Sequence, residues 1–395
     1  MLGRAARVAW ILAAGLLAAA CGGSTAPAGE AVTGTSADQA ERTPGETSGP
    51  ACVPADLETR AARVLVVGLP GATVSSDPKV DEILDVGVGG VLITSPNVES
   101  SAQVGQFVSD LQALADHPLV ITTGEESGRV ATFRDVLGTT PSARRLAATM
   151  SPEEVRQVAA DIGSGLAALG VDLDLAPVVD LDGGPPSGVI GDRSFSADPA
   201  TASAYGLAWA QGLASAGVAP TAKHFPGHGR VGGDSHIELP VVDATLDDLR
   251  QRDLVPFVDL IDAGVPVVML DHIAYTALDP DLPASLAPAA YELLRDLGFE
   301  GVAMTDSVGM GAVNLLWSFP EAAVLAVRAG ADAVLTTDGS QARGMRDALV
   351  AAVRSGELAE DRLDEAASRM TALAGGDTEA LACRAVTLPE LDTAG

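Results

Sequence analysis

The sequence predicts an α/β fold, a single (β/α)₈ barrel of the TIM type, on two observations. Eight short apolar runs, mostly of β-branched residues, recur along the chain with helical stretches between them. Nearly continuous apolar runs are typical of parallel strands covered on both faces, and eight strand–helix units close into a barrel. A doubly wound open sheet is the alternative, but no glycine-rich phosphate loop follows the first run. The predicted strands span residues 63–69, 89–94, 118–123, 171–177, 219–225, 266–271, 301–306 and 331–337.

The best-marked helix begins after Ser151. Serine is a preferred N-cap residue, Pro152 suits the first helical position, and Glu154 completes a capping box with Ser151. This helix lies between the third and fourth predicted strands, as the barrel requires.

Polar residues follow several of the predicted strands. The stretch KHFPGHGRVGGDSH begins at Lys223, near the end of the fifth strand, and Asp306 ends the seventh. Glu126 and Arg129 follow the third strand, and Arg193 lies in the long segment after the fourth. Active sites of such barrels lie at the carboxyl ends of the strands, so these side chains are expected at one rim.

The first residues are typical of an export signal. Arg4 and Arg7 precede an apolar run over residues 8–20, which is too short to span a bilayer. The small residues before Cys21 resemble a bacterial lipobox, which implies cleavage of a signal peptide, residues 1–20, and a lipid on the Cys21 thiol. We therefore expect a lipoprotein at the outer face of the cell membrane. Simple secretion without Cys21 is the alternative.

The next segment is predicted to be a tether. Residues 22–50 contain no aromatic and almost no large aliphatic side chains, so they cannot bury enough apolar surface to fold. The predicted organisation is a tether over residues 21–55, a barrel domain over 56–385 and a C-terminal tail over 386–395.

Two further cysteines flank the predicted domain. Disulfides persist in exported proteins, and Cys52 lies just before the predicted domain, whereas Cys383 lies near its end. We expect a bridge that ties the two ends together. Two free buried thiols are the alternative.

The charge of the chain limits its partners. A net charge of −29 disfavours nucleic acid, because the chain cannot neutralise a run of phosphates, and it disfavours an electrostatic hold on anionic lipid. We expect a soluble monomer with no nucleic-acid partner, whose membrane contact is the N-terminal lipid alone.

The glycine-rich loop after the fifth strand gathers three of the five histidines of the chain. His224, His228, Asp234 and His236 include zinc-ligand types. However, a histidine pair four residues apart suits a helix, which Pro226 and the loop glycines forbid. No metal and no cofactor is therefore expected.

The same loop is better suited to proton transfer. Asp234 and His236 are alternate residues of an extended segment, so their side chains point the same way and can pair. A carboxylate that orients an imidazole makes a general acid or base near neutral pH. The alternative is a solvated loop with an incidental histidine.

Asp306 is a candidate nucleophile. A carboxylate at the end of a buried strand is costly unless it has a charged or hydrogen-bonding partner or a catalytic role. In such a role it can attack an anomeric carbon to form a glycosyl-enzyme. The alternative is an N-cap for the next segment. Lys223 and His224 are natural donors to sugar hydroxyls, and Arg193, expected to be held by Asp192, is another.

Five stretches together resemble a known family. KHFPGHGRVGGDSHIELP, GDRSFSADP, GVGGVLI, PASLAP and LGFEGVAMTDSVGMGAV are similar to the single-domain β-N-acetylglucosaminidases of glycoside hydrolase family 3, over roughly residues 62–340. The resemblance implies a metal-free barrel and a retaining mechanism, with Asp306 as nucleophile and His236, paired with Asp234, as acid/base. The substrate-binding residues it implies are Lys223, His224, Arg193, Glu126, Arg129 and His228, the last of which shapes the loop.

The stretch after the third strand departs from the family pattern. Gly124 replaces an aspartate that grips hydroxyls at the far end of the sugar, Thr132 replaces an arginine, and Ser127 replaces a glycine. Loss of a charged hydrogen-bonding group costs about 1.5–3 kcal/mol of sugar binding. Glu125 is a candidate substitute for the missing carboxylate. Asp271 is a second departure, because a small residue usually precedes the equivalent of His272, and it is expected to add negative charge near the site.

Three functions are consistent with the sequence. The first is a retaining exo-β-N-acetylhexosaminidase that releases terminal β-linked N-acetylglucosamine from cell-wall-derived or related glycans. The second is a weakened carbohydrate-binding or regulatory paralogue, or a family member with altered sugar specificity. The third, a metal-dependent hydrolase, is disfavoured by the loop composition.

Overall fold

Eight parallel strands form the central sheet of the structure, a computed structural model that describes residues 52–231 and 239–393. Their order is β12-β9-β7-β6-β3-β2-β1-β13, and a single bridge from Met304 to Ala333 joins the two end strands and closes the barrel. All eight predicted strands are confirmed. Their bounds are β1 Leu65–Gly68, β2 Gly90–Ile93, β3 Val120–Thr123, β6 Leu173–Asp174, β7 Ala219–Phe225, β9 Val267–Leu270, β12 Val302–Thr305 and β13 Val334–Thr336.

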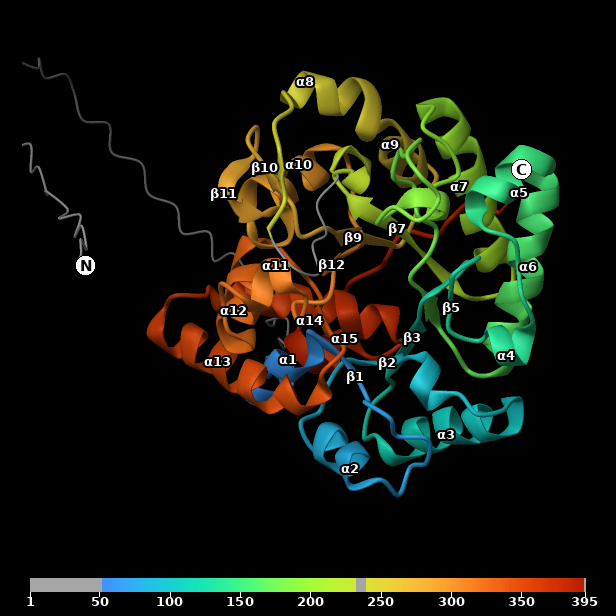
Figure 1. Ribbon diagram of the computed structural model, residues 1–395. Helices are drawn as coiled ribbons and strands as arrows, with labels where there is room; N and C mark the ends of the chain where they lie inside the picture. The colour runs from blue at the N-terminus through green and yellow to red at the C-terminus, as the bar shows by residue number, and fades with distance from the viewer. Residues whose placement is uncertain (1–51, 232–238, 394–395) are drawn as a thin grey trace, which may run out of the picture. The chain divides into compact units, whose positions relative to one another are not determined.

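A ring of helices surrounds the strands (Figure 1). Each strand is followed by one main helix, as the (β/α)₈ prediction required. These helices are α2 Pro78–Leu84, α3 Ser101–Leu114, α6 Pro152–Ala168, α7 Pro199–Ser215, α9 Val255–Asp262, α10 Pro288–Asp296, α12 Phe319–Ala329 and α13 Ala342–Ser355. Within the described residues, no helix is long and apolar enough to cross a bilayer.

The predicted start of α6 is also confirmed. The Ser151 hydroxyl accepts from the Glu154 backbone N–H at 3.3 Å, and the Glu154 carboxylate accepts from the Ser151 backbone N–H at 2.7 Å. Ser318 and Glu321 form the same capping box at the start of α12. Each box satisfies N–H groups that have no partner inside the helix.

The remaining strands, helices and turns lie outside the eight strand–helix units. The short strands are β4 Glu125–Ser127, β5 Val130–Ala131, β8 Val241–Val242, β10 Ala274–Tyr275 and β11 Asp279–Pro283. The additional α-helices are α1 Leu57–Arg63, α4 Arg134–Leu137, α5 Ala143–Thr149, α8 Leu246–Asp248, α11 Gly311–Asn314, α14 Glu360–Leu373 and α15 Thr378–Ala382. The single turns are η1 Ser95–Asn97, η2 Gly191–Arg193, η3 His228–Arg230, η4 Leu249–Asp253, η5 Ala284–Leu286 and η6 Gly339–Gln341.

Two apolar layers hold the barrel together. Alternate strand residues point to opposite faces, so in β12 Val302 and Met304 belong to the cluster inside the barrel, whereas Ala303 belongs to the layer between strands and helices. The interior cluster also contains Val66, Leu92, Val120, Leu173, Leu175, Val267, Met269, Ala333, Leu335 and Met370. A filled barrel leaves its strand ends as the place for a site.

The predicted C-terminal tail packs against the barrel. Leu388 contacts the interior cluster, and the Asp392 backbone N–H donates to the Ala263 carbonyl at 3.0 Å. The Gln211 side chain donates to the Asp392 carbonyl at 3.0 Å. The end of the chain is therefore fastened to the segments that enter the strands, away from the strand ends that carry the predicted site residues.

A disulfide joins Cys52 to Cys383, as expected from their positions on either side of the barrel. The Ala55 backbone N–H also donates to the Leu381 carbonyl at 2.9 Å. The two ends of the described domain are thus connected covalently and by the backbone.

Removal of this bridge is expected to weaken the domain. The paired Cys52→Ser and Cys383→Ser substitutions free a closed loop of several hundred residues in the unfolded chain, and a loss of about 2–4 kcal/mol of unfolding free energy is expected. Urea denaturation measures the loss. Cys21→Ser is the matched control, since it removes a cysteine but keeps the bridge. Equal stability of the double variant and the control would contradict the prediction.

Candidate active site

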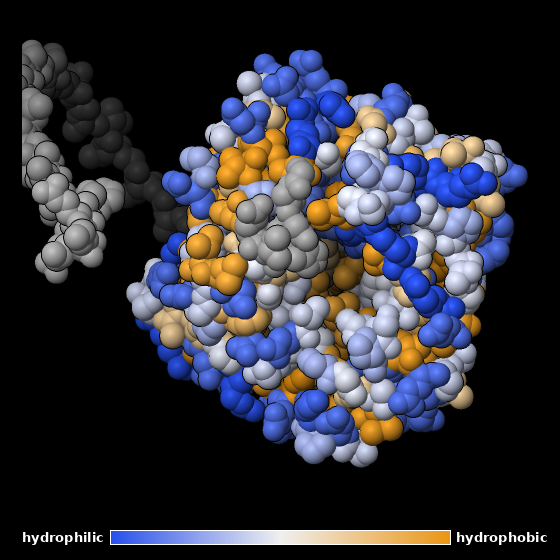
Figure 2. Space-filling model, in the orientation of Figure 1, coloured by the Kyte–Doolittle hydropathy of each residue, from blue (hydrophilic) through white to orange (hydrophobic). Residues whose placement is uncertain are grey.

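The carboxyl ends of four barrel strands bring the predicted site residues together. Glu126 lies just beyond β3, Arg193 in η2 after β6, Lys223 near the end of β7, and Asp306 directly after β12. Figure 2 shows the face of the molecule hollowed near the centre of the ring of strands. The expectation of a single polar rim at the strand ends thus agrees with the fold.

Glu126 is the centre of a buried ion cluster. Its carboxylate accepts two hydrogen bonds from the Arg193 guanidinium, at 2.7 and 2.8 Å, and pairs with the Lys223 ammonium. Burial alone would raise the pKa of Glu126, but the two cations hold it far below its ordinary value. Glu126 therefore stays ionised and fixes both cations in place.

Asp192 does not hold Arg193, so that expectation is wrong. The Asp192 carboxylate lies 3.1 Å from the Arg129 guanidinium instead. Adjacent side chains of a 3₁₀ turn point about 120° apart, so Asp192 and Arg193 face different partners.

His224 is oriented by a carboxylate that the sequence analysis missed. The imidazole Nδ1 lies 2.6 Å from Asp180 Oδ2, and the ring Nε2 lies 3.4 Å from Arg193 Nη2. Asp180 is 1% exposed and also accepts from the backbone N–H groups of His224 and His228. The signal in the sequence is an aspartate just after the fourth predicted strand, where a buried carboxylate could pair with His224.

His228 packs beside His224. The two rings meet edge to face with their centroids 5.7 Å apart, and burial lowers the pKa of His228 to about 4. A neutral, buried ring fits the predicted role of His228 in shaping the loop. The structure puts His228 within η3, next to the ion cluster.

Asp306 is ready to act as an anion. Its Oδ1 accepts from the Ser307 backbone N–H at 2.6 Å, and its own N–H donates to the Leu270 carbonyl at 2.9 Å. Burial alone would raise its pKa, but the His224 imidazole, the Ser307 backbone N–H and the Lys223 ammonium hold the pKa of Asp306 below its ordinary value. The residue is only partly buried.

His272 supports the same strand end. Its Nε2 donates to the Ser307 carbonyl at 2.9 Å, and its Nδ1 lies 2.6 Å from the Ser285 hydroxyl. Because a carbonyl only accepts, the proton is on Nε2, and Nδ1 of the neutral ring accepts from Ser285. Burial lowers the pKa of His272, which favours this neutral form. The ring thereby fixes Ser307, the residue that follows Asp306.

Arg129 contacts the loop after β6. Its guanidinium donates to the backbone carbonyls of Pro186, Gly188, Val189 and Ile190 at 2.6–2.9 Å. Arg144 binds the carbonyls of Gly184, Asp182 and Gly191 in the same segment. Two arginines therefore brace the loop that ends at Arg193, and the predicted sugar contact of Arg129 would have to be made from this bracing position.

The space beside Gly124 is open. A Cβ atom on Gly124 would meet no other atom within 4 Å, and the Thr132 hydroxyl donates to the Gly124 carbonyl at 3.0 Å. Glu125 does not replace the missing carboxylate, because its Oε2 accepts from the Phe133 backbone N–H at 2.7 Å and only 2% of the residue is exposed. Burial raises the pKa of Glu125 to about 7.

The predicted acid/base pair, Asp234 and His236, lies outside the described residues. No cluster of three or more histidine, cysteine or acidic side chains suited to a metal occurs in residues 52–231 and 239–393.

Comparison with known proteins identifies the family. The model for the glycosyl hydrolase family 3 N-terminal domain matches residues 57–373. The chain belongs to glycoside hydrolase family 3. It is 37% identical to the β-hexosaminidase LpqI of Mycobacterium tuberculosis over 381 residues, which cover 93% of this chain and 97% of that protein.

Solved structures of the family agree with the barrel. The structure of M. tuberculosis LpqI matches with a TM-score of 0.76 and 37% identity, covering 83% of this chain and 98% of that one. A family 3 β-N-acetylglucosaminidase from Paenibacillus matches with a TM-score of 0.78 and 35% identity, covering 85% of this chain and 65% of that one.

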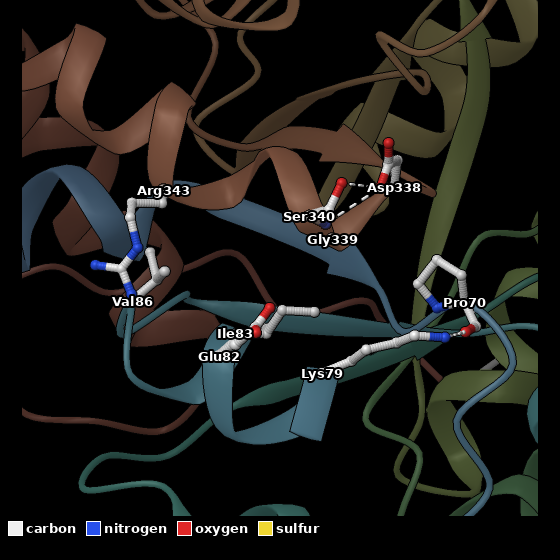
Figure 3. A pocket seen from close by; sticks show the side chains of 9 residues that line it. All are labelled: Pro70, Lys79, Glu82, Ile83, Val86, Asp338, Gly339, Ser340 and Arg343. Carbon is white, nitrogen blue, oxygen red and sulfur yellow. Dashed lines mark hydrogen bonds between the residues drawn. The ribbon is translucent and has the colours of Figure 1, made fainter. Parts of the chain in front are cut away.

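A separate pocket of about 590 Å³ lies between α2 and the start of α13 (Figure 3). Lys79 and Arg343 line it, and the Lys79 ammonium donates to the Pro70 carbonyl at 3.0 Å. None of the site residues named above lines this pocket. This pocket is therefore separate from the rim that carries Glu126 and Asp306.

Ser127, the residue after the central glutamate, has an unfavourable backbone. Its φ of 86° lies in the left-handed region, which costs about 1–2 kcal/mol for a residue with a Cβ atom. Its buried hydroxyl has no hydrogen-bond partner in the described part of the structure. Both features follow from the replacement of the family glycine.

Ser127→Gly is expected to stabilise the domain by about 0.5–1 kcal/mol, because glycine adopts positive φ freely while the unfolded chain gains some freedom. Thermal unfolding followed by circular dichroism measures the change. Ser127→Ala is the control, since it removes the hydroxyl but keeps the strained backbone. A gain in the alanine variant equal to that in the glycine variant would exclude backbone strain as the cause.

Proposed function

We propose that this family 3 hydrolase is a retaining exo-β-N-acetylhexosaminidase that removes terminal β-linked N-acetylglucosamine from cell-wall-derived or related glycans. The observation that carries the proposal is the place of Asp306, directly after β12, at the same rim as the fixed cations Lys223 and Arg193. The relatives named β-hexosaminidase and β-N-acetylglucosaminidase support the choice of sugar.

The first step of the reaction is attack by Asp306. The Ser307 N–H holds Oδ1, and Oδ2 has no hydrogen bond within the described residues. An Asp306 oxygen bonds to the anomeric carbon as the glycosidic C–O bond breaks, and the leaving oxygen takes a proton from the acid/base, for which we propose His236 paired with Asp234. Water, deprotonated by the same base, then attacks the anomeric carbon and releases Asp306.

The ion cluster supplies the sugar contacts. Lys223 and Arg193 present donors whose positions Glu126 fixes, so little ordering remains to be done when a sugar binds. His224, held by Asp180, lies beside Arg193 and adds a further polar edge. These fixed donors suit the hydroxyl and acetamido oxygens of an N-acetylhexosamine.

A family member with altered specificity or weakened turnover is the second candidate. The open space at Gly124 and the engagement of Glu125 with Phe133 favour it, because Glu125 does not supply the carboxylate that Gly124 lacks. The sugar would then be bound mainly by the ion cluster. Assays with N-acetylglucosaminides and with other β-glycosides separate the two candidates.

We further propose that the protein acts as a monomer at the outer face of the cell membrane, anchored by a lipid on Cys21. The lipobox-like residues before Cys21 and the polar composition of residues 22–50 support this proposal. Metabolic labelling with a fatty-acid analogue, lost in Cys21→Ser, tests the anchor. Labelling that persists in this variant would contradict it.

Asp306→Ala is expected to reduce kcat on a chromogenic N-acetylglucosaminide by about four orders of magnitude, because the covalent step loses its nucleophile. Azide should restore turnover by attacking from the vacated side, which yields the α-glycosyl azide. Asp338→Ala is the matched control, because Asp338 also follows a barrel strand but caps η6. Retained activity of Asp306→Ala without azide would remove Asp306 from the mechanism.

Gly124→Asp is expected to lower KM for N-acetylglucosaminides about tenfold, because it adds a charged acceptor where a Cβ atom meets no neighbour. Gly124→Asn, which has nearly the same shape without the charge, is the control. An unchanged KM in the aspartate variant would mean that the sugar does not use this end of the site or that another residue already binds it.

A further inference from the structure

Three acidic residues approach the start of the glycine-rich loop, over residues 227–230. The Asp180 carboxylate accepts from the His228 backbone N–H at 2.7 Å, and the Asp253 carboxylate pairs with the Arg230 guanidinium at 2.6 Å. The third, Asp271, reaches the loop through Tyr275. The first two contacts are each a carboxylate accepting from a donor on the loop.

The third contact differs in its chemistry. Tyr275 Oη lies 3.0 Å from the Gly227 carbonyl oxygen and 2.5 Å from Asp271 Oδ2. A carbonyl only accepts, and a tyrosine hydroxyl has a single proton to donate. If Tyr275 donated to an Asp271 carboxylate, the Gly227 oxygen would face the lone pairs of the hydroxyl at hydrogen-bonding distance.

A protonated Asp271 gives every oxygen a partner. Its Oδ2–H donates to Tyr275 Oη, Tyr275 donates to the Gly227 carbonyl, and Asp271 Oδ1 accepts from the Ile273 backbone N–H at 3.1 Å. The surroundings favour this form, because Asp271 is 0% exposed and Tyr275 is 1% exposed. Within residues 52–231 and 239–393, no lysine or arginine lies within ion-pair distance of Asp271.

The charged groups around Asp271 and Tyr275 also favour the neutral form of Asp271. Burial raises the pKa of Asp271 well above its ordinary value, and the Asp180 and Asp306 carboxylates add to the rise, against the hydrogen bond from Tyr275. Tyr275 also faces Asp253, whose charge is paired with Arg230. Ionising Asp271 would put a further anion among these carboxylates.

We propose that Asp271 is a neutral carboxylic acid and a positioning residue, which fixes the Gly227 carbonyl through Tyr275 and so sets the start of the segment that leads to the acid/base. A residue with a Cβ atom cannot replace Gly227 without strain, since its φ is 139° and a Cβ atom would lie 2.9 Å from Asp253 Cβ. The effect of Asp271 on the acid/base rests on the proposed function, whereas its neutral state does not.

The chemical state of Asp271 is tested with Asp271→Asn. An asparagine has the shape of the neutral acid, its amide N–H donates to Tyr275 Oη, and its oxygen accepts from Ile273, so stability at neutral pH is expected to stay at the wild-type level. The infrared difference spectrum of wild type minus Asp271→Asn should contain the band of a protonated carboxyl group. A marked loss of thermal stability in Asp271→Asn, or the absence of that band, would overturn the neutral acid. Neither readout needs a substrate.

The positioning role is tested with Tyr275→Phe, which removes only the hydroxyl. Misplacement of the acid/base is expected to lower kcat/KM about tenfold or more for an alkyl N-acetylglucosaminide, whose leaving group needs a proton. The dinitrophenyl glycoside needs no proton on its leaving group, so its kcat/KM should change less than about threefold. Asp271→Asn, the matched variant that keeps the donor, should resemble the wild type with both substrates.

Equal losses with both substrates in Tyr275→Phe would show a general structural defect and overturn the positioning role, and so would an Asp271→Asn variant as impaired as Tyr275→Phe. Thermal unfolding of each variant shows how much of it is folded. A wild-type enzyme inactive on all N-acetylglucosaminides would refute the proposed function, while the stability and infrared results for Asp271 would still stand.

Discussion

The pairing of Glu126 with Lys223 and Arg193 is the interaction on which the site depends. Burying any one of these charges alone would cost several kcal/mol, so the Glu126 carboxylate compensates the two cations and they compensate it. Glu126 follows β3, Arg193 follows β6, and Lys223 lies near the end of β7, so the cluster also ties together segments that are distant in the sequence. A sugar therefore meets cations whose geometry was fixed when the barrel folded, which is the preorganisation that electrostatic catalysis needs.

The environment decides which buried carboxyl groups carry charge. Glu126 and Asp180 contact cationic or N–H donors, and Asp306 faces the His224 imidazole and accepts from the Ser307 N–H, so these three have a lowered pKa. Glu125 and Asp174 are also buried, but without a direct cation, and burial raises the pKa of each. Carboxyl groups within one end of the barrel thus differ in pKa according to whether a cation or an N–H donor compensates their burial.

The fold could be predicted from the sequence because its signals are local. Each strand is a short apolar run, and the capping box of Ser151 and Glu154 marks the start of α6. Neither the strands nor this helix start require knowledge of distant residues. The placement of Lys223 and Asp306 at one rim then follows from the topology alone. The pairings could not be predicted in the same way. Asp192 is next to Arg193 in the chain, yet Arg193 pairs with Glu126, 67 residues away, because turn geometry and burial outweigh proximity in sequence.

The neutral form of Asp271 follows from the charge balance of the site. Among the described residues of the site, three carboxylates, Glu126, Asp180 and Asp306, face two cations, Lys223 and Arg193, which leaves one excess negative charge before the histidines are counted. One excess negative charge suits a glycosidase, because positive charge develops on the sugar ring in the transition state. A second would raise the pKa of Asp306 and favour its protonated form, which could not make the attack proposed for it. Asp271, the carboxyl group next to His272, is therefore compatible with this chemistry only if it keeps its proton. The Tyr275 hydroxyl oxygen accepts the hydrogen bond from that proton.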